Sequence, residues 1–238
     1  MVRAAGRAGR PARTSVWLAG RADGRVPRGG RARGDRPPPL DRDRITAVAA
    51  ALLDAEGPAG FSMRRLAAEL NVTAMSVYWY VDTKDDLLEL ALDAVYGELE
   101  LPDPDADDDW RDQLRALASG YRALLLRHPW VSPLAGTFPD IGPRSVAFSQ
   151  AVQRVVRRTG LPPHRLAGAV SAVLRFVYGS GGTVEGRLTR RPAGAGTDPD
   201  ASSGQAPGAV EEMRERDFHA ALDLVIAGIE TVALRGEP

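Results

Sequence analysis

The sequence has no cysteine and only one lysine, Lys84, among its 31 basic residues. Without cysteine it can form neither a disulfide framework nor a thiolate metal site. No stretch approaches the roughly 18 consecutive apolar residues that a membrane-spanning helix needs. The composition therefore favours a cytoplasmic protein. Its 44% hydrophobic content over 238 residues suffices for the cores of one small and one larger domain.

Catalytic signatures are also missing. The chain has no phosphate-binding glycine loop, no HExxH and no GxSxG motif. Its only histidines are His128, His164 and His219. The acidic run at 101–109 lacks the glycine and the closing glutamate of a calcium loop. We therefore expect no enzyme activity, no cofactor and no metal site.

Charge is distributed unevenly, although the net charge is zero. Residues 1–40 hold ten arginines against Asp23 and Asp35, a net charge of +8. Residues 41–100 hold five basic and twelve acidic residues, a net charge of −7. Because non-specific DNA affinity grows with the number of phosphates neutralised, residues 41–100 are not expected to bind DNA strongly through charge alone.

Residues 1–40 are rich in Ala, Gly and Arg, with three prolines at 37–39 and almost no aliphatic residues. Such a segment buries too little apolar surface to offset its ordering entropy, so we expect it to be disordered. Two roles remain open. It is either a basic arm that follows phosphates or enters a minor groove, or upstream sequence without a role, since a start near Leu40 would keep the helical pattern intact. A transit peptide is disfavoured because amphipathic periodicity is missing.

Residues 41–84 predict three short helices in close succession. In the first, at 41–56, the apolar positions share one face: Ile45, Val48, Ala49, Leu52 and Leu53. The Gly-Pro pair at 57–58 ends this helix. Ser62 caps a second helix, and Asn71 suits the left-handed turn that ends it. Thr73 then caps a third helix, at about 74–80. Such a trio is typical of a helix-turn-helix and points to DNA.

The third helix is short and mixes small, hydroxyl-bearing and aromatic residues, which favours docking in a major groove. The Ala-Met-Ser run at 74–76 can lie against base edges. The phenols of Tyr78 and Tyr80 suit contacts with phosphates. Val77 and Trp79 are instead expected to fill the core.

The segment RRLAAELNVTAMSVYWYVDTKDDLLE at 64–89 resembles the helix-turn-helix of the TetR family of transcriptional repressors, and it is most similar to the tetracycline-repressor branch. The resemblance implies that double-stranded DNA is a partner. It also implies an all-helical C-terminal half that dimerises and binds a small effector. The DNA-facing positions of the family correspond here to Ser62, Met63, Arg64, Thr73, Ala74, Met75, Ser76, Tyr78, Tyr80 and Lys84.

Beyond this motif, hydrophobic periodicity predicts further helices at 84–100, 110–127, 145–159, 163–185 and 210–234. The first is apolar around much of its circumference, as expected for a helix packed between two domains. We therefore predict an all-α chain with four parts: a disordered tail at 1–40, a helix-turn-helix domain at 41–84, a connecting helix at 85–100, and a helical effector-binding and dimerisation domain at 101–238. Residues 187–209 are expected to form a disordered loop.

Several side chains on the C-terminal helices are candidates for an effector cavity, although each also suits a plain core. They are Trp110, Tyr121, His128, Trp130, Phe138, Phe148, Arg175, Phe176 and Tyr178. A guanidinium inside an apolar stretch needs a carboxylate or an anionic ligand, which makes Arg175 the most specific of them. The tetracycline repressor binds metal through a histidine before an LGT segment. Here LAGT follows Pro133, so a metal-chelated effector is not expected.

The last predicted helices carry apolar stripes that suit a four-helix dimer interface. The candidate interface residues are Val170, Val173, Val177, Leu222, Val225, Ile226 and Ile229. Burial of the same residues within a single chain is the alternative. We expect a homodimer that represses transcription from a palindromic operator and is released by an apolar or aromatic small molecule. A DNA-binding activator or architectural regulator without an effector is the alternative function.

Overall fold

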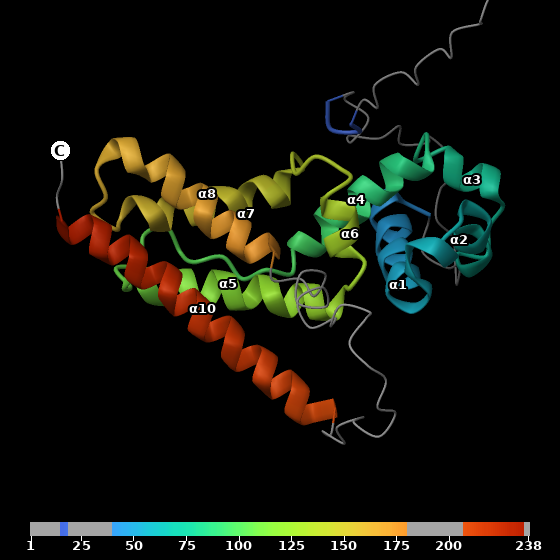
Figure 1. Ribbon diagram of the computed structural model, residues 1–238. Helices are drawn as coiled ribbons and strands as arrows, with labels where there is room; N and C mark the ends of the chain where they lie inside the picture. The colour runs from blue at the N-terminus through green and yellow to red at the C-terminus, as the bar shows by residue number, and fades with distance from the viewer. Residues whose placement is uncertain (1–14, 19–39, 180–206, 236–238) are drawn as a thin grey trace, which may run out of the picture.

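The computed structural model describes residues 15–18, 40–179 and 207–235, and every regular element within these ranges is a helix (Figure 1). The helices are α1 (Arg42–Gly60), α2 (Met63–Glu69), α3 (Ala74–Tyr78), α4 (Lys84–Tyr96), α5 (Trp110–Arg127), α6 (Val131–Ala135), α7 (Pro143–Arg157), α8 (Pro163–Gly179) and α10 (Pro207–Arg235). None of these helices is long and apolar enough to cross a membrane. The predicted all-α fold is confirmed.

Three capped helices form the N-terminal domain. The side chains of Asp41, Ser62 and Thr73 accept hydrogen bonds from backbone N–H groups in the first turns of α1, α2 and α3. Asn71 has φ 55°, the left-handed conformation that its sequence position predicted. The predicted stop at Gly57 is a kink with φ 68° and ψ 174°, after which α1 continues for one short turn. Local sequence signals therefore set most of the boundaries in this domain.

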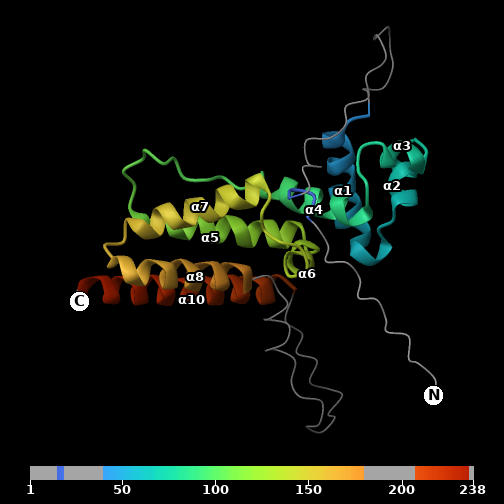
Figure 2. The ribbon, with the colours of Figure 1, turned by 90° about the horizontal axis from the view of Figure 1, so that it is seen from above.

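Helix α4 lies between the two domains and packs against α1, α6 and α7 (Figures 1 and 2). Its apolar residues are buried on nearly all sides, and three acidic residues, Asp86, Glu89 and Asp93, are buried with them. It ends at Tyr96, before the predicted limit of Glu100. A helix surrounded by both domains can transmit movement from one to the other.

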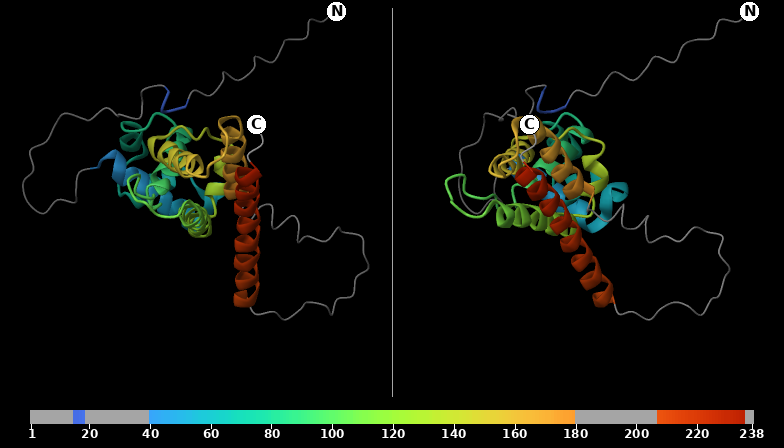
Figure 3. Two further views of the ribbon diagram at one scale, coloured as in Figure 1. Left: turned by 90° about the vertical axis from the view of Figure 1, so that its left-hand side faces the viewer. Right: turned by 60° about the vertical axis from the view of Figure 1, so that its left-hand side comes forward.

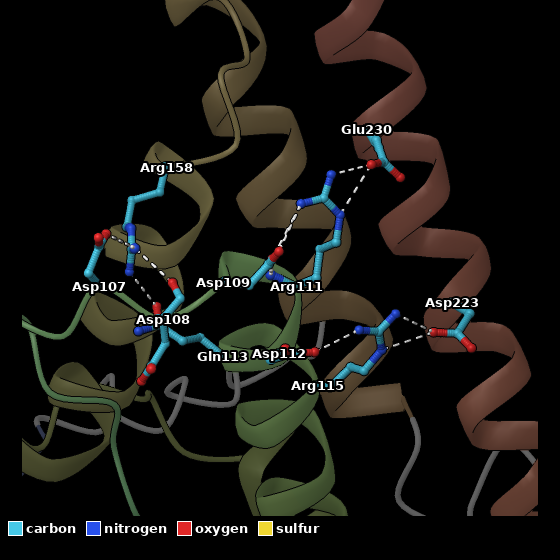
Figure 4. A network of polar contacts seen from close by, with 10 residues as sticks. All are labelled: Asp107, Asp108, Asp109, Arg111, Asp112, Gln113, Arg115, Arg158, Asp223 and Glu230. Carbon is cyan, nitrogen blue, oxygen red and sulfur yellow. Dashed lines mark hydrogen bonds and ion pairs between the residues drawn. The ribbon is translucent and has the colours of Figure 1, made fainter.

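Helices α5, α7, α8 and α10 form the C-terminal bundle, in which α8 and α10 lie side by side (Figure 2). Three arginines of α5 pair with acids of α10. Arg111 pairs with Glu230, Arg115 with Asp223 at 3.1 Å, and Arg122 with Glu211 at 2.9 Å. Figure 4 shows the first two pairs. Exposed pairs contribute little stability, but three along one helix fix the register of α10 on α5. The N-terminal part of α10 projects beyond the rest of the bundle (Figure 3), although Glu211 in this part still pairs with Arg122.

The linker at 101–109 is held by Arg158 at the end of α7. Its guanidinium donates to the carbonyl oxygen of Asp108 at 2.7 Å and lies 3.6 Å from the Asp107 carboxylate (Figure 4). Asp109 caps α5 by accepting from the backbone N–H of Arg111 at 2.7 Å. The acidic run therefore caps a helix start and contacts the end of α7.

Several elements of the C-terminal bundle differ from prediction. A short helix, α6, forms where the sequence predicted a break, and Pro133 lies inside it. Helix α7 begins at Pro143, two residues early, because proline is well accommodated in the first turn of a helix. Residues 187–206 of the predicted disordered loop lie outside the described residues, and 207–209 belong to α10.

The N-terminal tail contains a packed segment at 15–18, so the prediction of disorder is wrong there. Val16 is almost fully buried, and Ser15 donates its hydroxyl to Oε2 of Glu89 at 2.5 Å. The backbone N–H of Val16 donates to the same oxygen at 3.1 Å. The Val-Trp-Leu run in this segment was the available sequence signal. Residues 1–14 and 19–39 lie outside the described residues.

Candidate nucleic-acid interface and regulatory core

Helix α3 presents large side chains to solvent, which a short helix in a globular core would not do. Met75 is 69% exposed and Tyr78 43%, whereas Val77 is fully buried and anchors the helix. Trp79, predicted to fill the core, is 68% exposed, so that expectation is wrong. Trp79 lies in the turn that follows α3, and its side chain is exposed to solvent and not packed in the domain.

The other residues predicted to face DNA are either exposed to solvent or packed within the domain. Ser62, Arg64 and Thr73 are exposed, and Ala74, Ser76 and Tyr80 are partly exposed. Met63 is buried with the core of α2, so its assignment as a DNA contact is corrected. Met63 lies three residues before the buried Leu66 on α2, so the two side chains share the inward face of this helix.

Lys84 makes a contact within its own domain and also lies at the candidate interface. Its Nζ donates to the carbonyl oxygen of Phe61 at 2.8 Å and lies 5.4 Å from the centre of the Phe61 ring. An ammonium group carries three donors, so this contact leaves donors for a phosphate. The guanidinium of Arg65 forms ion pairs with Glu56 at 2.8 Å and Glu69 at 3.0 Å, so these carboxylates compete with any phosphate for it.

A polar cluster joins the two domains, and it is named here the interdomain clamp: Asp54, Glu98, His128 and Trp130. Oδ1 of Asp54 on α1 accepts from Nε1 of Trp130 at 2.6 Å and lies 2.7 Å from Nδ1 of His128. Nε2 of His128 lies 3.2 Å from Oε2 of Glu98. His128 and Trp130 were predicted to line an effector cavity. Instead, both side chains contact the DNA-binding domain through Asp54, which the sequence analysis did not identify.

Four aromatic rings pack together between α4, α5, α7 and α8. Tyr121 stacks on Phe148 with ring centres 5.3 Å apart, and Tyr178 meets Tyr121 edge-on at 5.3 Å. Tyr96 lies 5.7 Å from Tyr121, and their hydroxyls are 3.2 Å apart. Burial raises the pKa of all three tyrosines. Three predicted cavity residues therefore meet in space, and Tyr96 at the end of the connecting helix joins them.

Two carboxylates lie beside these rings, and neither was predicted. Oδ1 of Asp93 accepts from the backbone N–H groups of Arg144 and Ser145, both at 3.0 Å, at the start of α7. Burial raises its pKa despite these bonds. The pKa of Asp140 rises to about 6, first through burial and then through the charge of Asp93. The Asp93 side chain reaches α7 because Gly142 has no Cβ, which would clash with that carboxylate.

The remaining candidates for the effector cavity have other surroundings. Trp110 is buried under the guanidinium of Arg111, and Phe138 is buried. Phe176 stacks on Phe218 of α10 at 5.4 Å. Arg175 is exposed and donates to Ser171 at 3.4 Å, so its predicted interior position is wrong. Its position on the outer face of α8 leaves the guanidinium in water.

Five of the residues predicted to meet a partner are buried within one chain, which corrects the assignment of all of them except Ile229. They are Val173, Val177, Leu222, Ile226 and Ile229, all packed in the protomer's own core, with α8 against α10. The outer side of the same helix pair carries a largely apolar groove of about 510 Å³. Leu224, Gly168, Ala172 and Gly228 contribute to its lining, and Leu224 is 75% exposed. Val225 and Ile229 of the predicted interface also line this groove, so the candidate interface keeps these two residues and gains Leu224.

Comparisons with known proteins match both halves of the chain. The "Tetracyclin repressor-like, C-terminal domain" profile matches residues 101–233, and the "Bacterial regulatory proteins, tetR family" profile matches residues 45–91. An HTH-type transcriptional regulator of Saccharopolyspora erythraea is 43% identical over 143 residues, 60% of each chain. The HTH-type transcriptional repressor DrrR1 of Streptomyces coeruleorubidus is 37% identical over 69% of this chain and 58% of its own length. The matches thus span about 60% of these curated relatives.

Solved structures show the same architecture. The Streptomyces coelicolor TetR family protein ActR, in complex with actinorhodin, has a TM-score of 0.64 and 29% identity, covering 81% of this chain and 96% of its own. One profile alone spans more than half of the sequence, and the other contains the capped helices α2 and α3. The chain belongs to the TetR family of bacterial regulatory proteins.

Proposed function

We propose that this protein is a cytoplasmic, ligand-responsive transcriptional repressor that binds a palindromic operator as a homodimer and releases it when a small molecule enters the C-terminal domain. The observation that carries this proposal is the exposure of Met75, Tyr78 and Trp79 on and beside a capped helix of a helix-turn-helix domain. DrrR1 is named a repressor, and ActR was solved with actinorhodin, which supports the ligand-responsive form. The relatives are named as regulators, and we assign no catalytic role.

The alternative is a DNA-binding activator or architectural regulator without an effector. The interdomain clamp favours the ligand-responsive form because it links α1 to the α5–α6 turn and to the end of α4. A protein with no signal to transmit would not need polar contacts across its domain boundary, where apolar packing gives at least as much stability.

Sequence-specific binding is tested by substitutions on α3. Met75→Ala and Ser76→Ala should change which bases are preferred, because a contact with a base edge is worth about 1–3 kcal/mol. Tyr78→Phe should weaken binding to all sequences alike, as expected for a phosphate contact. The measurement is selection from a random duplex library, followed by titration. Met213→Ala removes the same type of side chain at an exposed position of α10 and should leave the preference unaltered. An unchanged preference for both α3 variants would contradict the assignment of the recognition face.

The arginine-rich tail can be tested separately from its packed segment. Deleting residues 1–14 removes four arginines but keeps Ser15 and Val16 in place. If these arginines bind phosphates, the slope of log affinity against log salt should flatten by about 0.9 for each phosphate that is no longer neutralised. Deleting residues 1–39 should also lower thermal stability, because Glu89 loses both donors from the tail. Equal slopes for all three proteins would show that the tail does not bind DNA.

A further inference from the structure

The buried aromatic rings lie beside two acceptor oxygens that make no hydrogen bond within the described residues. These are Oδ2 of Asp93, a residue only 3% exposed, and Oδ1 of Asp140. Buried polar atoms without a partner are uncommon in native proteins, and each calls for an explanation. Asp93 and Tyr96 are three residues apart on α4, so both side chains lie on the same face of this helix. The acids and the rings therefore belong to one cluster.

The negative charge in this cluster is only partly compensated. Arg144 places its NH1 3.9 Å from Oδ2 of Asp93, and this guanidinium is largely exposed. The groups that face Asp140 are Asp93 of α4 and the phenols of Tyr96, Tyr121 and Tyr178 from α4, α5 and α8. None of them is a cation. An ionised carboxylate in an apolar environment is costly unless a positive charge accompanies it.

We propose that Asp93, Asp140, Tyr96, Tyr121, Phe148 and Tyr178, named here the acid–aromatic cluster, form the binding site for a planar aromatic ligand that carries a protonated nitrogen. Aromatic faces attract organic cations, and a carboxylate beside them supplies the charge partner. Tyr121 and Phe148 already stack on one another, so their faces can also stack on a planar ligand. The inference rests on the proposed function because this ligand would be the effector that releases the operator.

Entry of such a ligand requires the rings to separate, and the cluster contains elements that would then move. Tyr121 belongs to α5, Phe148 to α7 and Tyr178 to the last turn of α8. Asp93 and Tyr96 belong to α4, which packs against the DNA-binding domain through α1. A ligand wedged against the acids would therefore push directly on the helix that joins the two domains.

The test compares two fluorescent probes of similar shape, 9-aminoacridine, which is protonated near neutral pH, and acridone, which is neutral. Binding to the full chain is measured without DNA. The wild type should bind 9-aminoacridine at least about tenfold more tightly than acridone, which is about the effect of one favourable charge contact. Asp140→Asn should abolish this preference. Asp105→Asn, which removes an exposed acid of the linker, should not change it.

The pH dependence gives a second readout. The Asp140 carboxylate is ionised above its pKa of about 6 and protonated below it, whereas 9-aminoacridine stays protonated. Affinity should therefore be full at pH 7.5 and fall about tenfold by pH 5. In Asp140→Asn, this loss should disappear. Acridone should show no such dependence with either protein.

Thermal unfolding distinguishes a ligand site from a structural acid. Removing an uncompensated buried charge should raise the melting temperature of Asp140→Asn by about 2–4 °C. Equal affinity for the two probes, or a lower melting temperature for the variant, would overturn the inference. Operator binding by the wild type is assayed in parallel. Intact operator binding with no cation preference would refute only the cluster, and absent operator binding would refute the proposed function.

Discussion

Replacing Leu224 with glutamate should convert the proposed dimer to monomers. This leucine is 75% exposed in a single chain and lies at the apolar groove between α8 and α10. Burying one leucine is worth about 1.5–3 kcal/mol, and a two-fold interface loses two of them. The dimerisation constant should therefore fall by about a hundredfold or more. Operator affinity should fall with it, because one recognition helix contacts too few base pairs to specify a site.

The measurement is sedimentation equilibrium combined with operator titration. Leu126→Glu introduces the same charge at an exposed leucine of α5, away from the groove, and should remain dimeric. Glutamate at Ile229 would be a poorer test, because that residue is largely buried within its own chain and its loss would disturb the protomer itself. A monomeric wild type that still binds its operator tightly would contradict the dimer model.

Replacing Asp54 with alanine should loosen the joint between the two domains. Oδ1 of Asp54 is the acceptor for Trp130 and a partner of His128, and both of those side chains are buried. A buried donor left without an acceptor costs about 1–3 kcal/mol. Because water can reach part of the Asp54 site, we expect the free energy of unfolding to fall by about 2 kcal/mol in total. Urea denaturation measures this change.

The same variant should weaken the response of operator binding to an effector. Coupling between two sites typically amounts to about 1–3 kcal/mol, and a contact that links α1 to the α5–α6 turn is a direct route for it. Asp43→Ala removes an exposed acid from the same helix and should leave both properties nearly unchanged. Undiminished stability and undiminished effector response in Asp54→Ala would exclude the clamp as the coupling element.

The sequence alone determined the helical class and the caps of the DNA-binding domain. Ser62, Asn71 and Thr73 act on the backbone within a few residues, so their effects are local and can be read from spacing. The hydrophobic periodicity at 110–127 also predicted a helix, and α5 has those bounds. The expectation for Trp79 failed because two turns of helix do not show which aromatic faces inward.

Only the tertiary structure decided which distant residues meet. Asp54 and His128 are 74 residues apart, Ser15 and Glu89 also 74, and Asp93 and Ser145 52. No local sequence pattern identifies such pairs, because an acidic residue is expected at the surface unless another element of the fold buries it. The apolar stripe of α10 was visible in the sequence, but whether α8 or a second chain covers it depends on how the helices pack. Local hydrogen bonding and periodicity fix the elements, whereas side-chain packing between them fixes the candidate site.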